Sequence, residues 1–207
     1  MMINLKIYTE KNNYFNHLAR TWDDMANSAN DGMLALVFER IDCPQGGKVL
    51  DAGCGTGVLF PHIFKKIGTA GELIAVDCAA EMIKTASEKF CTTENIVYRT
   101  AYVEELNEAP SSFDAIIAFA MFPHVEDKLS ALRKFRLLLK ETGRLYIFHL
   151  SDTAALNKFH GSLSSPVRND IMPGKDTLED IMRNARFEIK EYVDHTGLNF
   201  IEARPCM

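Results

Sequence analysis

The sequence lacks an excess of positive charge, a targeting segment and long apolar runs. Its formal net charge is −5, with the acidic residues spread along the chain. This balance argues against nucleic acids and anionic membranes as partners, because both select for a basic face. No stretch approaches the ~18 apolar residues of a membrane helix, and the N-terminal residues contain no apolar leader region. We therefore expect a cytoplasmic protein.

Cysteine usage excludes two further classes of protein. The five cysteines are an odd number, and no two of them form a C-x-x-C pair. The pattern fits neither a disulfide framework nor a zinc-binding signature, and it predicts reduced thiols. The five are Cys43, Cys54, Cys78, Cys91 and Cys206.

Apolar residues make up 47 % of the 207 residues, which is enough to form the core of one domain of ordinary size. From residue 48 onward, short apolar runs alternate with segments of helical periodicity. Apolar strands that alternate with helices predict a parallel sheet covered on both faces. The expected strands are 48–51, 73–77, 96–99, 115–119 and 144–150, and the expected helices are 34–41, 58–66, 81–90, 128–139 and 177–185.

The last part of the chain follows a different pattern. Residues 187–194 and 198–204 are predicted strands, separated by three residues that end in Gly197, so they are close enough to form an antiparallel hairpin. Residues 151–175 form a long irregular connection, and connections of this length inside a compact domain usually carry function. We therefore predict an α/β, Rossmann-like, doubly wound fold, with seven mostly parallel strands and an antiparallel C-terminal hairpin.

Residues 49–57, VLDAGCGTG, place three glycines directly behind an apolar run that ends in Asp51. A turn of this kind lets the backbone approach a ligand beyond the carboxyl end of the sheet. The dinucleotide fingerprint G-x-G-x-x-G is absent, because Val58 or Phe60 stands where its third glycine would be. No G-K-S/T follows, which excludes a P-loop. The Asp51 carboxylate would repel a pyrophosphate and suits a cationic ligand, such as an ammonium or a sulfonium.

This turn resembles motif I of the class I S-adenosylmethionine-dependent methyltransferases, and further segments of the chain resemble the family in order. Asp77 ends the second expected strand, twenty residues after Gly57, where the family places the acid that binds the cofactor's ribose. Residues 112–117 (SFDAII) and 137–145 (LLLKETGRL) resemble the family's entries to strands four and five. Residues 15–23 (FNHLARTWD) are similar to the segment that caps the cofactor pocket in the small-molecule branch, which includes ubiquinone and menaquinone methyltransferases.

The resemblance implies S-adenosyl-L-methionine as the cofactor. Asp51 would bind its ammonium group and Asp77 its ribose, and Cys78 and Met82 would flank its adenine. Tyr102 stands where the family often has an acid that holds the adenine amino group. We therefore expect Tyr102 to pack on the ring and the backbone of Val103 to bind it. The expected cofactor-binding residues are Asp51, Ala52, Gly53, Cys54, Gly55, Gly57, Asp77, Cys78, Met82, Tyr102, Val103 and Ala118.

Three of the six histidines lie where methyl transfer would take place. His124 follows the fourth expected strand and His149 ends the fifth, and neighbouring parallel strands bring both to one edge of the sheet. His160 lies in the long connection. His149 is the first candidate for a general base or substrate ligand, His160 the second and His124 the third.

Two other interpretations of these histidines stay open. Each can be a structural residue, bonded to the backbone at the end of its strand or helix. Alternatively, His149 and His160 can converge, together with His124 or Asp152, on a bound metal, or on a substrate that contains a metal or metalloid. Their spacing matches no known metal signature.

We predict a single methyltransferase domain over residues 1–207 that acts on a small molecule as a monomer or homodimer. Residues 1–45 would form an N-terminal helical cap, 46–150 the cofactor-binding core, 151–176 a substrate lid, and 177–207 the C-terminal helix and hairpin. No N/D-P-P-Y/F segment follows the fourth expected strand, which argues against the enzymes that methylate DNA amino groups. A non-catalytic module that binds the cofactor and acts through protein partners is an alternative.

Overall fold

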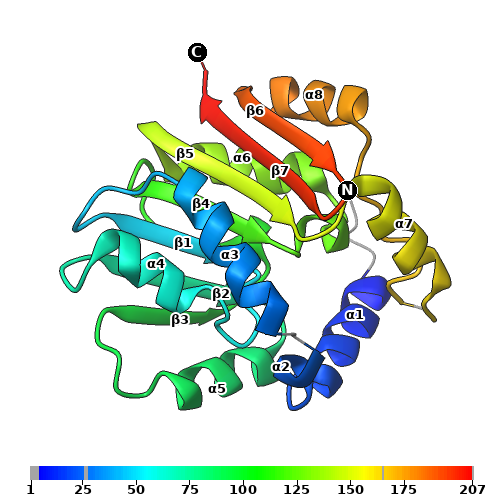
Figure 1. Cartoon of the computed structure of the whole chain (residues 1–207), viewed down its shortest axis with the longest axis horizontal. Helices are drawn as coiled ribbons and strands as arrows, with labels where there is room; N and C mark the ends of the chain where they lie inside the picture. Colours follow the sequence, from blue (N-terminus) through cyan, green and yellow to red (C-terminus); the bar gives the residue numbers. More distant parts are fainter. Residues whose placement is uncertain (1–4, 26–27, 165, 207) are drawn as a thin grey trace.

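The computed structural model describes residues 5–25, 28–164 and 166–206 (Figure 1). The strands found among these residues are β1 (Lys48–Ala52), β2 (Glu72–Asp77), β3 (Ile96–Thr100), β4 (Phe113–Phe119), β5 (Leu139–His149), β6 (Phe187–His195) and β7 (Leu198–Pro205). In this part of the chain they form one seven-stranded sheet, in the order β3-β2-β1-β4-β5-β7-β6. β1 to β5 pair in parallel, whereas β7 is antiparallel to both β5 and β6. The predicted fold class is confirmed.

Helices cover both faces of this sheet (Figure 1). The longer helices are α1 (Leu5–Leu18), α3 (Ser28–Arg40), α4 (Phe60–Ile67), α5 (Ala80–Lys89), α6 (Lys128–Leu138), α7 (Thr153–Ser162) and α8 (Lys175–Asn184). Short helical turns are α2 (Trp22–Met25), η1 (Val103–Glu105) and η2 (Phe122–His124). α3, α4 and α5 pack against one face, and α6 and α8 pack against the other. This arrangement is the doubly wound one that the alternation of strands and helices predicts.

Each central strand contributes side chains to two separate cores. Val49 and Leu50 are adjacent in β1 and both are fully buried. Val49 packs with residues of α3 and α4, and Leu50 packs with residues of α6 and α8. Because successive side chains of a strand point to opposite faces, a sheet covered on both sides needs unbroken apolar runs. The continuous apolar character of the predicted strands has this cause.

Three helical segments lie outside the two layers. α1, α2 and α7 gather beyond the ends toward which the arrows of β4 and β5 point (Figure 1). These are the carboxyl ends of the parallel strands, where open α/β sheets bind ligands.

Several predicted boundaries differ from the structure. α3 begins at Ser28, six residues before the expected start at Leu34. α4 begins at Phe60 and not at Val58, because the glycine turn continues through residue 59. β5 begins at Leu139, five residues before the expected start, and Leu139 pairs with Phe113 across an irregularity in the register. The connection 151–175, which we expected to be irregular, contains α7.

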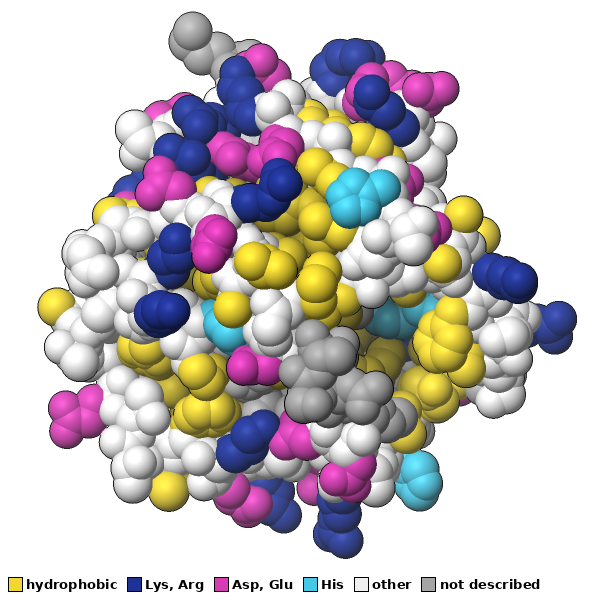
Figure 2. All heavy atoms as spheres, in the orientation of Figure 1, with side chains coloured by type: hydrophobic (Ala, Val, Ile, Leu, Met, Phe, Trp, Pro, Cys, Tyr) yellow, Lys and Arg dark blue, Asp and Glu magenta, His cyan; other side chains and the backbone are white. Residues whose placement is uncertain are grey.

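The surface agrees with the mixed charge of the sequence. On the face drawn in Figure 2, basic and acidic side chains are interspersed. Within the described ranges, no helix is both long enough and apolar enough to span a membrane.

Candidate functional site

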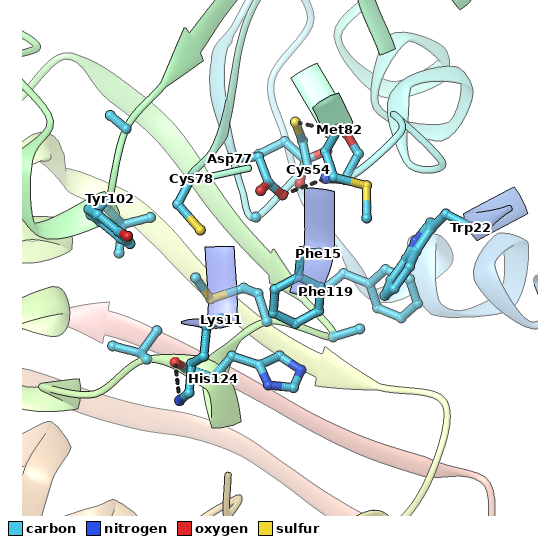
Figure 3. A pocket seen from close by; sticks show the side chains of 18 of the residues that line it. Lys11, Phe15, Trp22, Cys54, Asp77, Cys78, Met82, Tyr102, Phe119 and His124 are labelled. Atoms are coloured by element: carbon cyan, nitrogen blue, oxygen red, sulfur yellow. Dashed lines mark hydrogen bonds between the residues drawn. The ribbon is translucent and has the colours of Figure 1, made fainter. Parts of the chain in front are cut away.

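A cavity lies at the carboxyl ends of β1, β2 and β4 (Figure 3). One wall comes from α1 and α2, which contribute Phe15 and Trp22. The opposite wall comes from the glycine turn after β1 and from residues that follow β2, β3 and β4. Most of its lining is apolar or aromatic, as is usual for sites that bind small molecules, with a few charged groups at fixed positions.

The glycine turn depends on glycine for its shape. Gly53 has a φ of +73°, in the left-handed region that side chains disfavour. The N–H groups of Gly53 and Cys54 both donate to the carbonyl oxygen of Val76, at 2.8 and 2.9 Å. A Cβ on Gly53 would lie 2.5 Å from the Cβ of Met121. The turn is thus held against both β2 and the loop after β4, and no side chain fits between them.

Asp51 lies at the bottom of this cavity and is only 1 % exposed. Neither of its carboxylate oxygens has a hydrogen-bond partner in the part of the chain that the structure describes. Burial, together with the charge of Asp77, raises the pKa of Asp51 to about 8. A buried carboxyl group without a partner is costly, so its presence here indicates a binding site for a cationic group.

Asp77 is fixed by the backbone around it. Its Oδ2 accepts a hydrogen bond from the N–H of Gly55 at 3.0 Å, and its Oδ1 accepts one from Ala79 at 2.9 Å. Burial raises the pKa of Asp77 in spite of these bonds. Each carboxylate oxygen has a second lone pair, so this side chain can also accept hydrogen bonds from ligand hydroxyls in the cavity that it lines.

The far end of the cavity is formed by Cys78, Met82, Tyr102 and Val103. The ring of Tyr102 meets that of Tyr8 edge to face, with centroids 4.6 Å apart, and its hydroxyl donates to the Tyr8 carbonyl at 3.3 Å. Tyr102 is therefore oriented by α1 and presents an apolar ring to the cavity. This arrangement suits a flat aromatic ligand.

Three of the expected cofactor-binding residues lie behind the cavity wall. Ala52 and Ala118 are fully buried within β1 and β4, and they are not among the lining residues. Gly57 does not line the cavity either. Its φ is +86°, and a Cβ at this position would lie 2.7 Å from the ring of Phe60. The residues that follow Ala118 line the wall instead: Phe119, Ala120 and Met121. Their position at the carboxyl end of the fourth predicted strand was the signal for them.

The structure brings the three candidate histidines together but gives them different environments. His124 lines the cavity, and its ring centroid is 5.0 Å from that of His160. His160 is buried, with its Nδ1 2.6 Å from the carbonyl oxygen of Asp170. His149 is 3 % exposed and its Nε2 has no partner among the described residues. Burial lowers the pKa of His149 to about 3, and His124 and His160 add to the shift.

Of the three, only His124 reaches the cavity. Among the described residues, no group of three His, Cys, Asp or Glu side chains is arranged to hold a metal ion. The interpretation of the histidines as a metal site is therefore not supported.

Sequence reasoning missed two charged residues beside His124. Lys11 of α1 lines the cavity and contacts Glu126, Asp170 and the backbone carbonyl of His124. Asp170 lies in the connection 151–175, and its Oδ2 is 2.7 Å from Nδ1 of His124. Nothing in the spacing of these residues along the chain indicates that they meet.

Polar contacts fasten the N-terminal helices over the cavity. The side-chain amide of Asn12 donates to the carbonyl oxygen of Cys78 at 2.9 Å. Asp23 accepts a hydrogen bond from the hydroxyl of Thr56, and its other oxygen is 2.6 Å from Nζ of Lys89. α1 and α2 are thus tied to the glycine turn and to the end of β2, and they form one wall of the cavity.

The segment 151–176 approaches the site only indirectly. None of its described residues lines the cavity. It contacts the site through Asp170 and His160, and its own fold is held by a pair of hydrogen bonds between Asn157 and the backbone of Met172, at 2.8 and 3.0 Å.

Comparison with known proteins identifies relatives. A family profile described as a methyltransferase domain matches residues 44–188. A ubiquinone biosynthesis O-methyltransferase of Xanthomonas campestris is 34 % identical in an alignment of length 149 that covers 68 % of this chain and 61 % of the relative. The chain thus spans less than two thirds of the length of that relative.

Two further comparisons cover more of both chains. A ubiquinone/menaquinone biosynthesis C-methyltransferase of Idiomarina loihiensis is 30 % identical, over 88 % of this chain and 84 % of the relative. The solved structure of DhpI in complex with SAH superposes with a TM-score of 0.77 at 17 % identity, over 99 % of each chain. At this low identity the superposition shows a shared fold.

Proposed function

We propose a function for this chain from one premise: it belongs to the class I S-adenosylmethionine-dependent methyltransferases. The proposed reaction is methyl transfer from S-adenosylmethionine to a small molecule. The names of two relatives, an O-methyltransferase and a C-methyltransferase of quinone biosynthesis, support an acceptor of that size.

The observation that carries the proposal is the unpaired carboxyl group of Asp51. S-adenosylmethionine has an ammonium group and a sulfonium, and either would supply the positive charge that a buried carboxylate needs. Asp77, which lines the same cavity, would bind the ribose hydroxyls. The apolar end of the cavity, at Cys78, Met82 and Tyr102, fits the adenine. Together these residues match the charge and polarity of the cofactor from one end to the other.

When bound, the cofactor supplies an electrophilic methyl group on positively charged sulfur. The protein then has to hold the acceptor in line and exclude water, and orientation alone can contribute about 7–11 kcal/mol. The aromatic residues of α1 and α2 would exclude water from the cavity. His124 faces the cavity, so we place it ahead of His149 and His160 as the histidine that meets the acceptor; the other two stay candidates for support.

Calorimetry with S-adenosylhomocysteine tests the proposal. We expect the wild-type protein to bind it, and Asp51→Asn to weaken binding by at least about tenfold, because a hydrogen bond to a charged group contributes ~1.5–3 kcal/mol. Asp180→Asn is the matched control, since Asp180 is an exposed residue paired with Arg183, and it should bind like the wild type. Binding of nicotinamide dinucleotides in place of the nucleoside would refute the proposal.

The acceptor can be sought without knowing its identity. Purified protein and S-adenosylmethionine are added to a low-molecular-weight cell extract, and release of S-adenosylhomocysteine is followed with and without a chelator. We expect release that depends on the extract and is insensitive to the chelator. A lid function for residues 151–176, the other domain boundaries, a cytoplasmic location and a monomeric or homodimeric state stay predictions.

A further inference from the structure

A network of charged side chains lies beside the cavity, apart from the residues assigned to the cofactor. It consists of Lys11, Glu126, Asp170 and His124, and both Lys11 and Asp170 are less than 10 % exposed. In Figure 3, Lys11 and His124 lie across the cavity from Asp77 and Cys54. The network therefore faces the part of the cavity that the cofactor residues leave for the acceptor.

Asp170 uses both of its carboxylate oxygens in this network. Oδ1 is 2.5 Å from Nζ of Lys11, and Oδ2 is 2.7 Å from Nδ1 of His124. Burial alone would raise the pKa of Asp170, but the hydrogen bond from His124 and the bond and charge of Lys11 outweigh it and hold the pKa below its usual value. Asp170 is thus ionised at neutral pH, and an ionised carboxylate can only accept hydrogen bonds.

This fixes the position of the proton on His124. Because Asp170 can only accept, Nδ1 of His124 must carry the hydrogen. Burial lowers the pKa of His124 in spite of Asp170, so the ring is neutral at pH 7 and its lone pair is on Nε2. Among the described residues Nε2 forms no hydrogen bond, and the side chain is 20 % exposed in the cavity wall.

We propose that Asp170 and Lys11 are positioning residues that hold His124 in the Nδ1–H tautomer, so that Nε2 takes the acceptor's proton during methyl transfer. The proposal rests on the proposed function. As the methyl–sulfur bond breaks, its electron pair stays on sulfur and the acceptor atom forms the new bond to carbon. The acceptor's proton moves to Nε2, and the carboxylate of Asp170 stabilises the imidazolium that results. The acceptor is therefore a molecule whose methylated atom carries a proton before the reaction and loses it during methyl transfer.

Lys11 has a second role in this arrangement. Its hydrogen bond and its charge help to hold the pKa of Asp170 low, so the pKa of Asp170 would rise if the ammonium group were removed. A protonated Asp170 could donate a hydrogen bond and would no longer fix the tautomer. The other titratable groups that surround His124 are His149 of β5, His160 of α7 and Lys128 of α6.

Nitrogen-15 NMR of histidine-labelled protein tests the tautomer without any acceptor. At pH 7 we expect His124 to be neutral, with the hydrogen on Nδ1, and Asp170→Asn to allow both tautomers. Asp180→Asn is the control, because it alters only an exposed ion pair with Arg183, and it should leave the signals of His124 unchanged. A hydrogen on Nε2 in the wild-type protein would overturn the proposal, and this holds even if Asp170→Asn does not fold.

Kinetics in the cell extract described above test the catalytic role. His124→Gln should slow release of S-adenosylhomocysteine by about 10²–10⁴-fold, and Asp170→Asn by a smaller factor of at least about tenfold. Both should bind S-adenosylhomocysteine as tightly as the wild type. The rate should rise with pH as His124 loses its proton, and Asp170→Asn should move that rise to lower pH, because the carboxylate stabilises the imidazolium.

Two outcomes separate this proposal from the function on which it rests. If Asp170→Asn matches the wild type in rate and pH profile, Asp170 is not a positioning residue, although the protein can still be a methyltransferase. If the wild-type protein does not bind S-adenosylhomocysteine, the proposed function itself is refuted.

Discussion

At the scale of single residues, Gly53 shows why the turn after β1 tolerates no side chain. Gly53→Ala should destabilise the protein by about 1–3 kcal/mol, because it combines a left-handed backbone with a clash against Met121. Gly197→Ala is the matched control, since its φ is +87° but nothing lies within 4 Å of its Cβ. Urea unfolding of both variants measures the difference. Equal losses would show that the contact with Met121 contributes nothing.

Asp51 links the binding site to the pH dependence of stability. Its folded pKa, about 8, is far above the ordinary 3.8, so between these two values the folded state holds a proton that the unfolded state has released. The ligand-free protein should therefore lose stability as pH rises from 4 to 8. Asp51→Asn should remove this part of the loss and be more stable than the wild type at pH 8. Urea unfolding at pH 6 and pH 8 measures the effect.

Asp180→Asn should lose as much stability between pH 6 and pH 8 as the wild type, because Asp180 is exposed and its pair with Arg183 is screened by solvent. If Asp51→Asn lost as much stability over this pH range as the wild type, the carboxyl group of Asp51 would already be ionised in the ligand-free protein.

Local spacing was sufficient to find some site residues and not others. Asp51 and Gly53 lie in one turn, so their relation is visible in nine consecutive residues. By contrast, His124 contacts Lys11, which is 113 residues away in the sequence, and Asp170, which is 46 residues away. A contact between distant parts of the chain leaves no local pattern, and only the fold reveals it.

At the scale of helices and strands, α6 and α7 both begin with an aspartate N-cap. The side chain of Asp127 accepts a hydrogen bond from the N–H of Ser130, and that of Asp152 accepts one from Ala155, both at 2.9 Å. Asp152→Ala should cost about 1 kcal/mol and should increase hydrogen–deuterium exchange in α7, because this helix has only one buried side chain, His160.

Asp127→Ala is the control for that experiment. It removes an equivalent cap from α6, which buries Ala131, Leu132, Phe135 and Leu138, so local exchange there should change much less. Equal increases in the two helices would contradict the view that α7 depends on its N-cap more than α6 does.

The predicted strands are close to the observed ones because burial on both faces gives them a simple apolar signal. α1 lacked such a signal, since residues 5–18 are mostly polar. Its position depends on contacts with the domain, such as those of Asn12 and Lys11. The early start of β5 was hidden by Lys140, Glu141 and Thr142, which are polar residues in a strand that pairs irregularly.

At the scale of the whole molecule, the N-terminal helices form one wall of the cavity that the cofactor would occupy, so a bound ligand should restrict their motion. We expect S-adenosylhomocysteine to slow hydrogen–deuterium exchange in α1 and α2 more than in α8, which packs on the far side of the sheet from α3 and α4. Mass spectrometry of peptic peptides measures this. Uniform protection of all helices would indicate a general gain in stability rather than closure of this wall.

The doubly wound fold class with its C-terminal hairpin was the most predictable property of the molecule, and the acceptor side of the cavity was the least. The alternation of apolar runs with helices leaves few topologies open, whereas the cavity is completed by segments from both ends of the chain.

The chain has a single tryptophan, and Trp22 lies at the cavity wall, where its indole nitrogen would be 3.6 Å from a Cβ on Gly55. The protein consequently contains its own optical probe. Emission from this one fluorophore should report ligand occupancy directly, without a label, and it can be followed in stopped-flow experiments to time the binding and release of ligands.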